Sequence, residues 1–210
     1  MKKYVNLPLS RFTVDISAKT ATPGGGSASA AAAALGISLL MMSANFSIRK
    51  DGTAGNNSKI KKILSGLLKA HKQALDMIDE DIKLYGAVDK AFKLSRTSDR
   101  DIKYRSKKLQ SALKKSAASP VRVLEISAGV VTAAEKLIET GNKNLISDTY
   151  CGVSFLRAAI ETAKYNIDAN LKYISDAAYK NFIRKKSGKL IRTANARLDR
   201  MAHGYESKTN

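Results

Sequence analysis

Three consecutive glycines followed by a serine form the most distinctive local feature of this 210-residue chain. The segment reads Thr22-Pro23-Gly24-Gly25-Gly26-Ser27 and leads into an uncharged, alanine-rich stretch. Because glycine lacks a Cβ atom, the backbone here can approach a ligand closely or adopt left-handed angles. We expect Ser27 to cap the helix that follows, whose free N–H groups favour an anion or a carbonyl oxygen. The alternative is a tight entry turn before a buried helix. The glycine segment is not a Walker loop, because no Gly-Lys-Ser/Thr follows it.

A second candidate for chemistry is the acidic cluster Asp79-Glu80-Asp81, which stands out in a very basic chain. Asp81 adjoins Ile82 and lies three residues after Ile78, so it falls at the edge of an apolar helical stripe. Partial burial at that edge would raise its pKa and suit the carboxylate to general acid–base work. The alternative is three solvated acids on a helix surface.

Amides and hydroxyls gather in the second half of the chain, beginning with the segment Gly141-Asn142-Lys143-Asn144. Ser147 or Asp148 is a candidate helix cap. Asn166 and Asn170 are four residues apart on an otherwise apolar face, where buried amides need partners. Such amides orient a polar heterocycle or form hydrogen bonds across a helix interface.

Helical periodicity dominates the elements that must position these residues. Apolar residues recur at spacings of three and four, first in a stripe of Ile60, Ile63, Leu64, Leu67, Leu68, Leu75, Ile78 and Ile82. A polar break follows at Thr97-Ser98-Asp99. Ser119-Pro120 predicts a second break, since the residue before a proline is pushed away from helical geometry.

Two further signals complete the prediction of fold class. Gly141-Asn142 predicts a helix stop, with Gly141 in the left-handed conformation that glycine adopts readily. The β-branched alternation of strands appears only briefly, over residues 12–16. We therefore expect an all-α protein, an antiparallel helical bundle with long helices.

Composition narrows the classes of partner. The chain has 37 Lys and Arg against 18 Asp and Glu, a formal charge of +19, which attracts polyanions such as nucleic acid, anionic lipid or a multiply charged small ligand. One Cys excludes an internal disulfide, and one Cys with two His are too few for a Cys/His zinc site. No metal site is expected.

Membrane and export signals are weak. The uncharged stretch over residues 20–48 is long enough to span a membrane, but Pro23 and three glycines interrupt it and alanine and serine insert poorly. Arg11, Asp15 and Lys19 lie where a signal peptide needs an apolar core. We expect a buried helix in a cytoplasmic protein that does not bind membranes.

Basic charge is concentrated in two segments. Residues 93–115 hold nine Lys and Arg against two acids, and residues 184–210 hold eight against two. Solvated helix faces explain such runs, and so does nucleic-acid binding. No zinc finger, RNA-recognition signature or basic zipper supports nucleic acid as the main partner.

Taken together, these motifs resemble the cyclodeaminase/cyclohydrolase family, folate enzymes related to the C-terminal domain of formiminotransferase-cyclodeaminase. The resemblance spans about residues 5–182, and five motifs occur in the family's order. They are Ala21-Thr22-Pro23-Gly24-Gly25-Gly26-Ser27; Asp81 with Tyr85 and Ala91-Phe92; Gln110, Ala112 and Pro120; Gly141-Asn142, Asn144 and Ser147-Asp148; and Asn166 with Asn170.

The resemblance implies a helical subunit that forms a dimer or higher homo-oligomer and acts on the N5–C–N10 bridge of tetrahydrofolate. It implies hydrolysis of 5,10-methenyltetrahydrofolate to 10-formyltetrahydrofolate, or cyclisation of formiminotetrahydrofolate with release of ammonia. No cofactor is expected, and polyglutamylated folate is one candidate form of the substrate. The main alternative is a non-catalytic basic helical protein that binds nucleic acid.

The resemblance also assigns roles to individual residues. Asp81 is expected to transfer protons. The expected substrate-binding residues are Pro23, Gly24, Gly25, Gly26, Ser27, Lys50, Asn142, Asn144, Ser147, Asp148, Asn166 and Asn170. The loop around Lys50 departs from the family pattern because it has no nearby tyrosine. We divide the chain into a family-like helical domain over residues 1–183 and a basic extension over 184–210.

Overall fold

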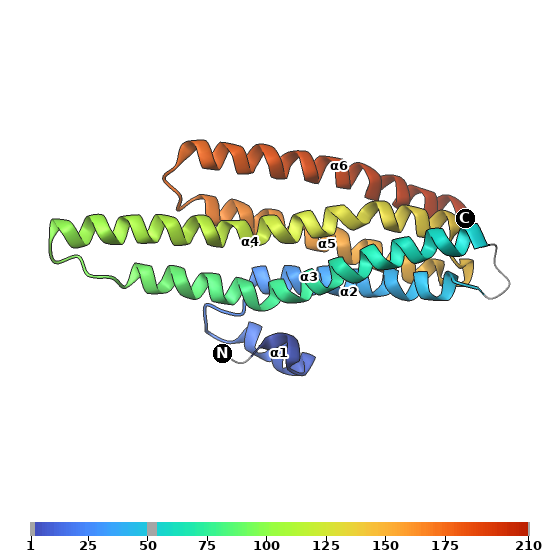
Figure 1. Ribbon diagram of the computed structural model, residues 1–210, viewed down its shortest axis with the longest axis horizontal. Coiled ribbons are helices and arrows are strands. Elements are labelled where there is room, and N and C mark those ends of the chain that lie inside the picture. Colours follow the sequence, from blue (N-terminus) through green and yellow to red (C-terminus); the bar gives the residue numbers. More distant parts are fainter. Residues whose placement is uncertain (1–2, 50–53, 210) are drawn as a thin grey trace.

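Five long helices run roughly along one axis, and the chain reverses direction between consecutive helices (Figure 1). The structure is a computed structural model that describes residues 3–49 and 54–209, and those residues contain no strand. The helices are η1 (Tyr4–Asn6), α1 (Leu9–Ser17), α2 (Gly25–Ser47), α3 (Ala54–Phe92), α4 (Asp99–Thr140), η2 (Lys143–Leu145), α5 (Ile146–Leu171) and α6 (Ala177–Thr209). The predicted all-α bundle is confirmed.

Helix α2 is the central element, packed against α3, α4 and α5. Its small side chains allow a close crossing with α5 at two glycines. A Cβ atom on Gly36 would lie 2.9 Å from the Gly152 carbonyl oxygen, and one on Gly152 would lie 2.9 Å from that of Gly36. By length and composition α2 and α4 would each pass as membrane spans, but 56% and 61% of their most apolar windows are buried inside the bundle.

Helix α4 continues through Pro120, so the break predicted at Ser119-Pro120 is wrong. A proline inside a helix removes one backbone hydrogen bond and its ring crowds the preceding turn. Here buried residues on both sides, including Ala117, Val121 and Leu124, hold the helix against its neighbours. Tertiary packing therefore outweighs the local preference of the proline.

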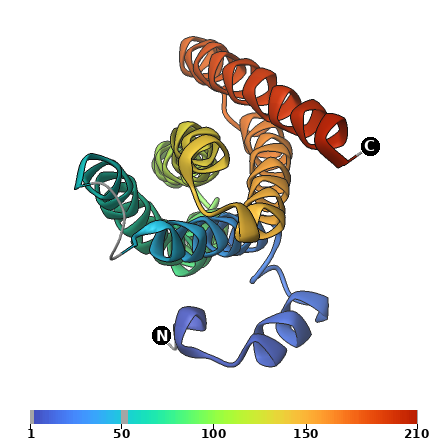
Figure 2. The ribbon, with the colours of Figure 1, turned by 90° about the vertical axis from the view of Figure 1, so that its right-hand side faces the viewer.

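Two local expectations also need correction. Helix α4 ends at Gly141 as predicted, but Gly141 has φ −79° and is not left-handed. Residues 12–16, which alternate like a strand, belong to α1, where Phe12 is buried against the ring of Tyr4. Helix α1 lies to one side of the bundle in both ribbon views (Figures 1 and 2).

The two basic segments occupy different places. Residues 93–115 belong to the end of the α3–α4 hairpin, which projects beyond α2 and α5 (Figure 1). Residues 184–209 continue α6 without interruption from Ala177, and Ala194, Leu198 and Met201 are buried. The segment assigned to an extension is therefore the larger part of a packed helix.

Candidate active site

The glycine segment forms the start of α2. Gly24 is the N-cap, in an extended conformation, and its carbonyl accepts the first helical hydrogen bond, from the Ala28 N–H at 3.0 Å. No side chain caps this end, so the prediction that Ser27 is the cap is wrong. Ser27 is fully buried, and its hydroxyl donates to the Ile78 carbonyl on α3 at 2.9 Å.

Asp81 lies directly on the first turn of α2. A Cβ atom built on Gly26 would fall 2.3–2.5 Å from the three carboxyl atoms of Asp81, so any larger residue would displace the acid. The backbone N–H of Ser27 also donates a hydrogen bond to Asp81. The glycine is therefore needed for the carboxylate to reach the positive end of the helix.

Two serine hydroxyls complete the surroundings of the carboxyl group. Ser119 of α4 donates to Asp81 Oδ1 at 3.3 Å, and the Ser27 hydroxyl lies 3.5 Å from Oδ2. The sequence pattern predicts no role for Ser119 beyond its position before a proline. The signal for its role is that Ser116, Ser119 and Ser127 lie among the buried apolar positions of α4.

Burial raises the pKa of Asp81 above its ordinary value, and the hydrogen bonds from Ser119 and Ser27 oppose that shift only in part. The predicted direction is confirmed. A half-buried carboxyl group with an elevated pKa keeps its proton to a higher pH than a solvated one, which suits it to proton transfer.

The other two acids of the cluster have different roles. Asp79 accepts hydrogen bonds from the backbone N–H groups of Tyr4 and Val5 at 2.7 and 3.3 Å, which fastens the N-terminal segment to α3. Glu80 forms an ion pair with Lys83 at 3.2 Å on the surface. Only Asp81 faces the glycines.

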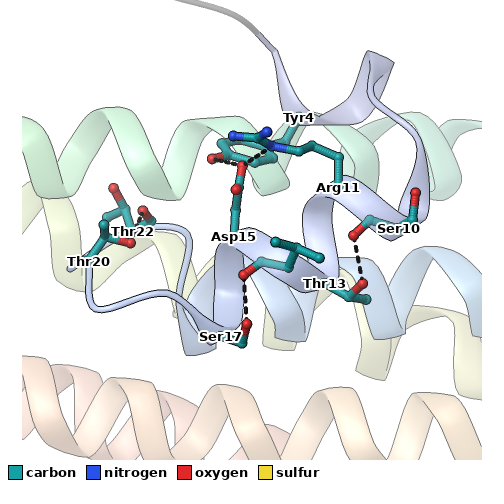
Figure 3. Close-up of polar contacts among 9 residues, drawn as sticks. Tyr4, Ser10, Arg11, Thr13, Asp15, Ser17, Thr20 and Thr22 are labelled. Atoms are coloured by element: carbon teal, nitrogen blue, oxygen red, sulfur yellow. Dashed lines mark hydrogen bonds and ion pairs between the residues drawn. The ribbon is translucent and has the colours of Figure 1, made fainter.

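The N-terminal segment that leads to the glycines is ordered by its own polar contacts (Figure 3). The Tyr4 hydroxyl and the Arg11 guanidinium both donate to Asp15 Oδ2 at 2.9 Å. Thr20 donates to the Thr22 carbonyl at 3.1 Å just before Pro23, which is buried and follows a cis peptide bond. These contacts fix the direction in which the chain enters α2.

Asn166 of α5 forms the opposite side of the glycine segment. Its Oδ1 atom lies 3.0 Å from the position that a Cβ atom on Gly25 would occupy. Its Nδ2 atom donates to the Thr162 carbonyl at 2.8 Å and lies 3.4 Å from the Ser29 hydroxyl. Asn170 is half-buried one turn further along α5. The structure thus brings the glycines, Asp81 and Asn166 together from three helices.

The remaining predicted site residues lie at the other end of α2. The Asn142 backbone N–H donates to Ser47 at 2.8 Å, and its side chain donates to the Phe46 carbonyl at 3.3 Å. Ser47 is 21 residues beyond Gly26, about 31 Å along the helix axis. Within one chain, Asn142, Asn144, Ser147 and Asp148 therefore do not share a site with Asp81, contrary to the expectation.

Helix capping accounts for part of this second group. Asn142 Oδ1 accepts from the Asn144 N–H at 3.0 Å and so caps η2. Helix α5 starts at Ile146 with Leu145 as its N-cap and no side-chain cap, so neither Ser147 nor Asp148 has the predicted capping role. Lys50 lies outside the described residues.

A cleft of about 400 Å³ between α3 and α4 is lined by Lys115, one helical turn before Ser119. Another hollow, of about 700 Å³, is an open groove between α3 and α4 near Gly66 and Gly129. Gly66 and Asp81 are 15 residues apart on α3, about 22 Å. Among the described residues, no group of three or more His, Cys, Asp or Glu side chains is placed to hold a metal ion.

Comparison with known proteins identifies the family of the chain. The model of the formiminotransferase-cyclodeaminase family matches residues 8–189. The chain belongs to this family. The match includes the glycine segment, Asp81, Ser119 and Asn166, and ends within α6.

Named relatives of the family carry two activities. Methenyltetrahydrofolate cyclohydrolase of Methylorubrum extorquens is 29% identical over 98% of this chain and 99% of its own length. Formimidoyltransferase-cyclodeaminase of Rattus norvegicus is 26% identical over 92% of this chain, which spans only 36% of that longer protein. A crystal structure of formiminotetrahydrofolate cyclodeaminase from Thermotoga maritima superimposes with a TM-score of 0.83 at 28% identity, covering 95% of this chain and 98% of that one.

Proposed function

We propose that this chain is an enzyme of folate one-carbon metabolism that hydrolyses 5,10-methenyltetrahydrofolate to 10-formyltetrahydrofolate. The observation that carries the proposal is the Asp81 carboxyl group, held on the first turn of α2 by Ser27 and Ser119 with a raised pKa. Full-length similarity to a methenyltetrahydrofolate cyclohydrolase supports this choice of reaction.

The reaction needs two proton movements that one carboxyl group can supply. Asp81, as the carboxylate, accepts a proton while water adds to the methenyl carbon, and a tetrahedral carbon bearing a hydroxyl group forms. The N5–C bond then breaks as the hydroxyl proton leaves and N5 gains a proton. The formyl group stays on N10, and one proton is released for each substrate.

The start of α2 positions the reacting end of the substrate in this proposal. The first N–H groups of a helix have no helical acceptor, so they are free to donate to a carbonyl oxygen of the substrate. Gly25 and Gly26 allow the substrate to approach that backbone closely. Asn166 supplies an amide on the far side, and Asn170 extends the polar rim. No cofactor is required for these steps.

Absorbance of the methenyl compound offers a direct test. We expect wild-type protein to remove the methenyl band faster than buffer does, and Asp81→Asn to abolish the acceleration. Asp79→Asn is the matched control, because Asp79 fastens the N-terminal segment and does not face the glycines. Equal rates for Asp81→Asn and wild type would refute the assignment of Asp81.

Cyclodeamination is the second candidate, favoured by the structural similarity to the Thermotoga maritima cyclodeaminase. In that reaction N10 attacks the formimino carbon and ammonia leaves, so Asp81 would accept the N10 proton and return it to the leaving nitrogen, which takes one further proton from solvent. Release of ammonia from 5-formiminotetrahydrofolate, with no decay of the methenyl band, would establish this activity instead.

The assembly and surroundings of the enzyme complete the proposal. We expect the enzyme to lie in the cytoplasm and to form a homodimer. The dimer is expected because α1 exposes Leu9, Val14 and Ile16 beside the bundle, and a second subunit would cover them. Light scattering of the purified protein measures the assembly directly.

The +19 charge would draw a polyglutamylated folate toward the site. Equal Michaelis constants for mono- and polyglutamylated substrate at low salt would contradict that use of the charge.

A further inference from the structure

Positive charge is concentrated at the free end of the α3–α4 hairpin, as it also is along α6. We call residues Gly86–Lys115 the arm; it contains ten Lys and Arg and three Asp, a net formal charge of +7. The arm extends beyond α2 and α5, so both of its helices are open to a large partner (Figure 1). The proton transfers proposed for Asp81 do not use this charge, although it is part of the +19 that would attract a polyglutamylated folate.

Few of these cations are neutralised within the chain. Lys93 pairs with Asp89 at 2.7 Å, and Lys114 pairs with Asp176 at 2.6 Å. No other Lys or Arg of the arm forms an ion pair with the part of the chain that the structure describes. The remaining eight are available to an external polyanion.

A cleft of about 400 Å³ lies between the two helices of the arm. Lys90, Lys108 and Lys115 line it together with the half-exposed ring of Tyr104. The rest of the lining consists of the hydroxyl-bearing Ser111 and the apolar residues Ala87, Ala91, Leu94 and Ala112. A flat ring, an apolar lining and several cations together suit an aromatic base attached to phosphates.

The same surface is poorly suited to a lipid bilayer. Membrane-binding helices need a contiguous apolar face that inserts among acyl chains. The exposed rings of Phe92 and Tyr104 instead carry cations: the guanidinium carbons of Arg105 and Arg96 lie 4.9 and 5.6 Å from the Phe92 centroid, and Lys108 Nζ lies 5.4 Å from that of Tyr104, where a stacked base would have to displace it. Charge without an insertable face favours a soluble polyanion.

We propose that the arm binds single-stranded nucleic acid, with a base against Tyr104 in the cleft and phosphates on Lys90, Lys108 and Lys115. This binding is a second function of the chain and is independent of the folate chemistry. Single-stranded sites elsewhere combine the same two elements, a basic groove along the backbone and aromatic rings on which bases stack.

Fluorescence anisotropy with an oligo-uridine of about 12 nucleotides tests the proposal. We expect the triple variant Lys90→Gln, Lys108→Gln, Lys115→Gln to bind at least about tenfold more weakly, and its log–log salt slope to fall in magnitude by about 2. Tyr104→Leu should weaken binding about tenfold and leave the salt slope unchanged, because it removes stacking and no charge.

A second triple variant provides the matched control. Lys185→Gln, Lys189→Gln, Arg192→Gln removes the same charge from exposed positions on α6 and should change affinity less than about twofold. An equal loss in both triple variants would refute a specific site on the arm. Equal affinity for duplex and single strands, or tighter binding to vesicles of phosphatidylcholine and phosphatidylglycerol, would also refute it.

Enzyme assays of the same proteins separate the two proposals. The arm variants should keep wild-type turnover and Michaelis constant for the methenyl substrate. A raised Michaelis constant with unchanged oligonucleotide binding would assign the cleft to the folate tail and overturn the nucleic-acid proposal. If Asp81→Asn loses turnover and the arm variants do not, the result agrees with separate sites for folate and nucleic acid.

Discussion

The two ends of α2 carry similar polar residues but different chemistry. At its start, Asp81 meets a helix end through glycine backbone, and burial leaves its carboxyl group with a raised pKa. At its other end, Asn142 donates and accepts hydrogen bonds within a network that includes Ser47 and Asn144. A polar residue whose hydrogen bonds are satisfied within the fold stabilises the fold. A buried carboxyl group whose hydrogen bonds offset the cost of burial only in part has a shifted pKa and can serve in proton transfer.

Asp81→Asn should produce the largest difference between the two ends. We expect turnover to fall by about 10²–10⁴, the usual contribution of a general acid or base. The free energy of unfolding of this variant should increase. Because burial raises its pKa in the folded state, Asp81 binds a proton more tightly there than when unfolded.

The sign of the pH dependence follows from that difference. Stability falls as pH rises from the ordinary value of 3.8 through the raised pKa of the folded state, where the buried carboxyl group becomes charged. Asp81→Asn should therefore melt at a higher temperature than wild type at pH 8, with a smaller difference at pH 4. A lower melting temperature at pH 8 would show that the charge mainly stabilises the start of α2.

Gly26→Ala should have the second-largest effect. The new Cβ atom would overlap the carboxyl group of Asp81, so the acid must move. Displacement of about 1 Å from a reacting geometry costs about 10²-fold in turnover. Gly129→Ala is the matched control, since a Cβ atom there meets nothing within 4 Å. The control should keep full activity and gain about 0.5–1 kcal/mol of stability.

Asn142→Ala tests the opposite end. We expect a loss of about 1 kcal/mol in the free energy of unfolding, measured by urea denaturation, because the cap on η2 disappears. Turnover should stay within about twofold of wild type. Asn144→Ala, whose side chain is exposed, should change neither quantity. A large loss of turnover in Asn142→Ala would mean that this end completes the site of another subunit.

Ser119→Ala should give the smallest effect, a shift in the pH profile. The Ser119 hydroxyl donates to Asp81 and partly offsets the effect of burial, so its loss raises the pKa of Asp81 further. The profile limb governed by Asp81 should move to higher pH, with plateau turnover within about threefold of wild type. Ser116→Ala, also buried on α4, should leave the profile in place.

The sequence predicts much of this molecule because its patterns are local. Apolar spacing predicts the long helices, and the position of Asp81 beside Ile78 predicts a half-buried acid. The continuity of α4 through Pro120 and the inward turn of Ser27 depend on tertiary packing, which outweighs local preference. The separation of Asn142 from Gly26 depends on helix length and packing direction, which no motif records.

The crossing of α2 and α5 restricts how this family member can diverge. Gly36 and Gly152 each occupy the space that a methyl group on the other helix would need. A mutation at either position separates the backbones, and a second mutation at the partner glycine adds to the separation. The nearest obstacle in each case is a backbone carbonyl oxygen, which no substitution of a neighbouring side chain removes. Substitutions tolerated at the crossing are therefore confined to residues around the glycine pair, and the two glycines themselves must stay.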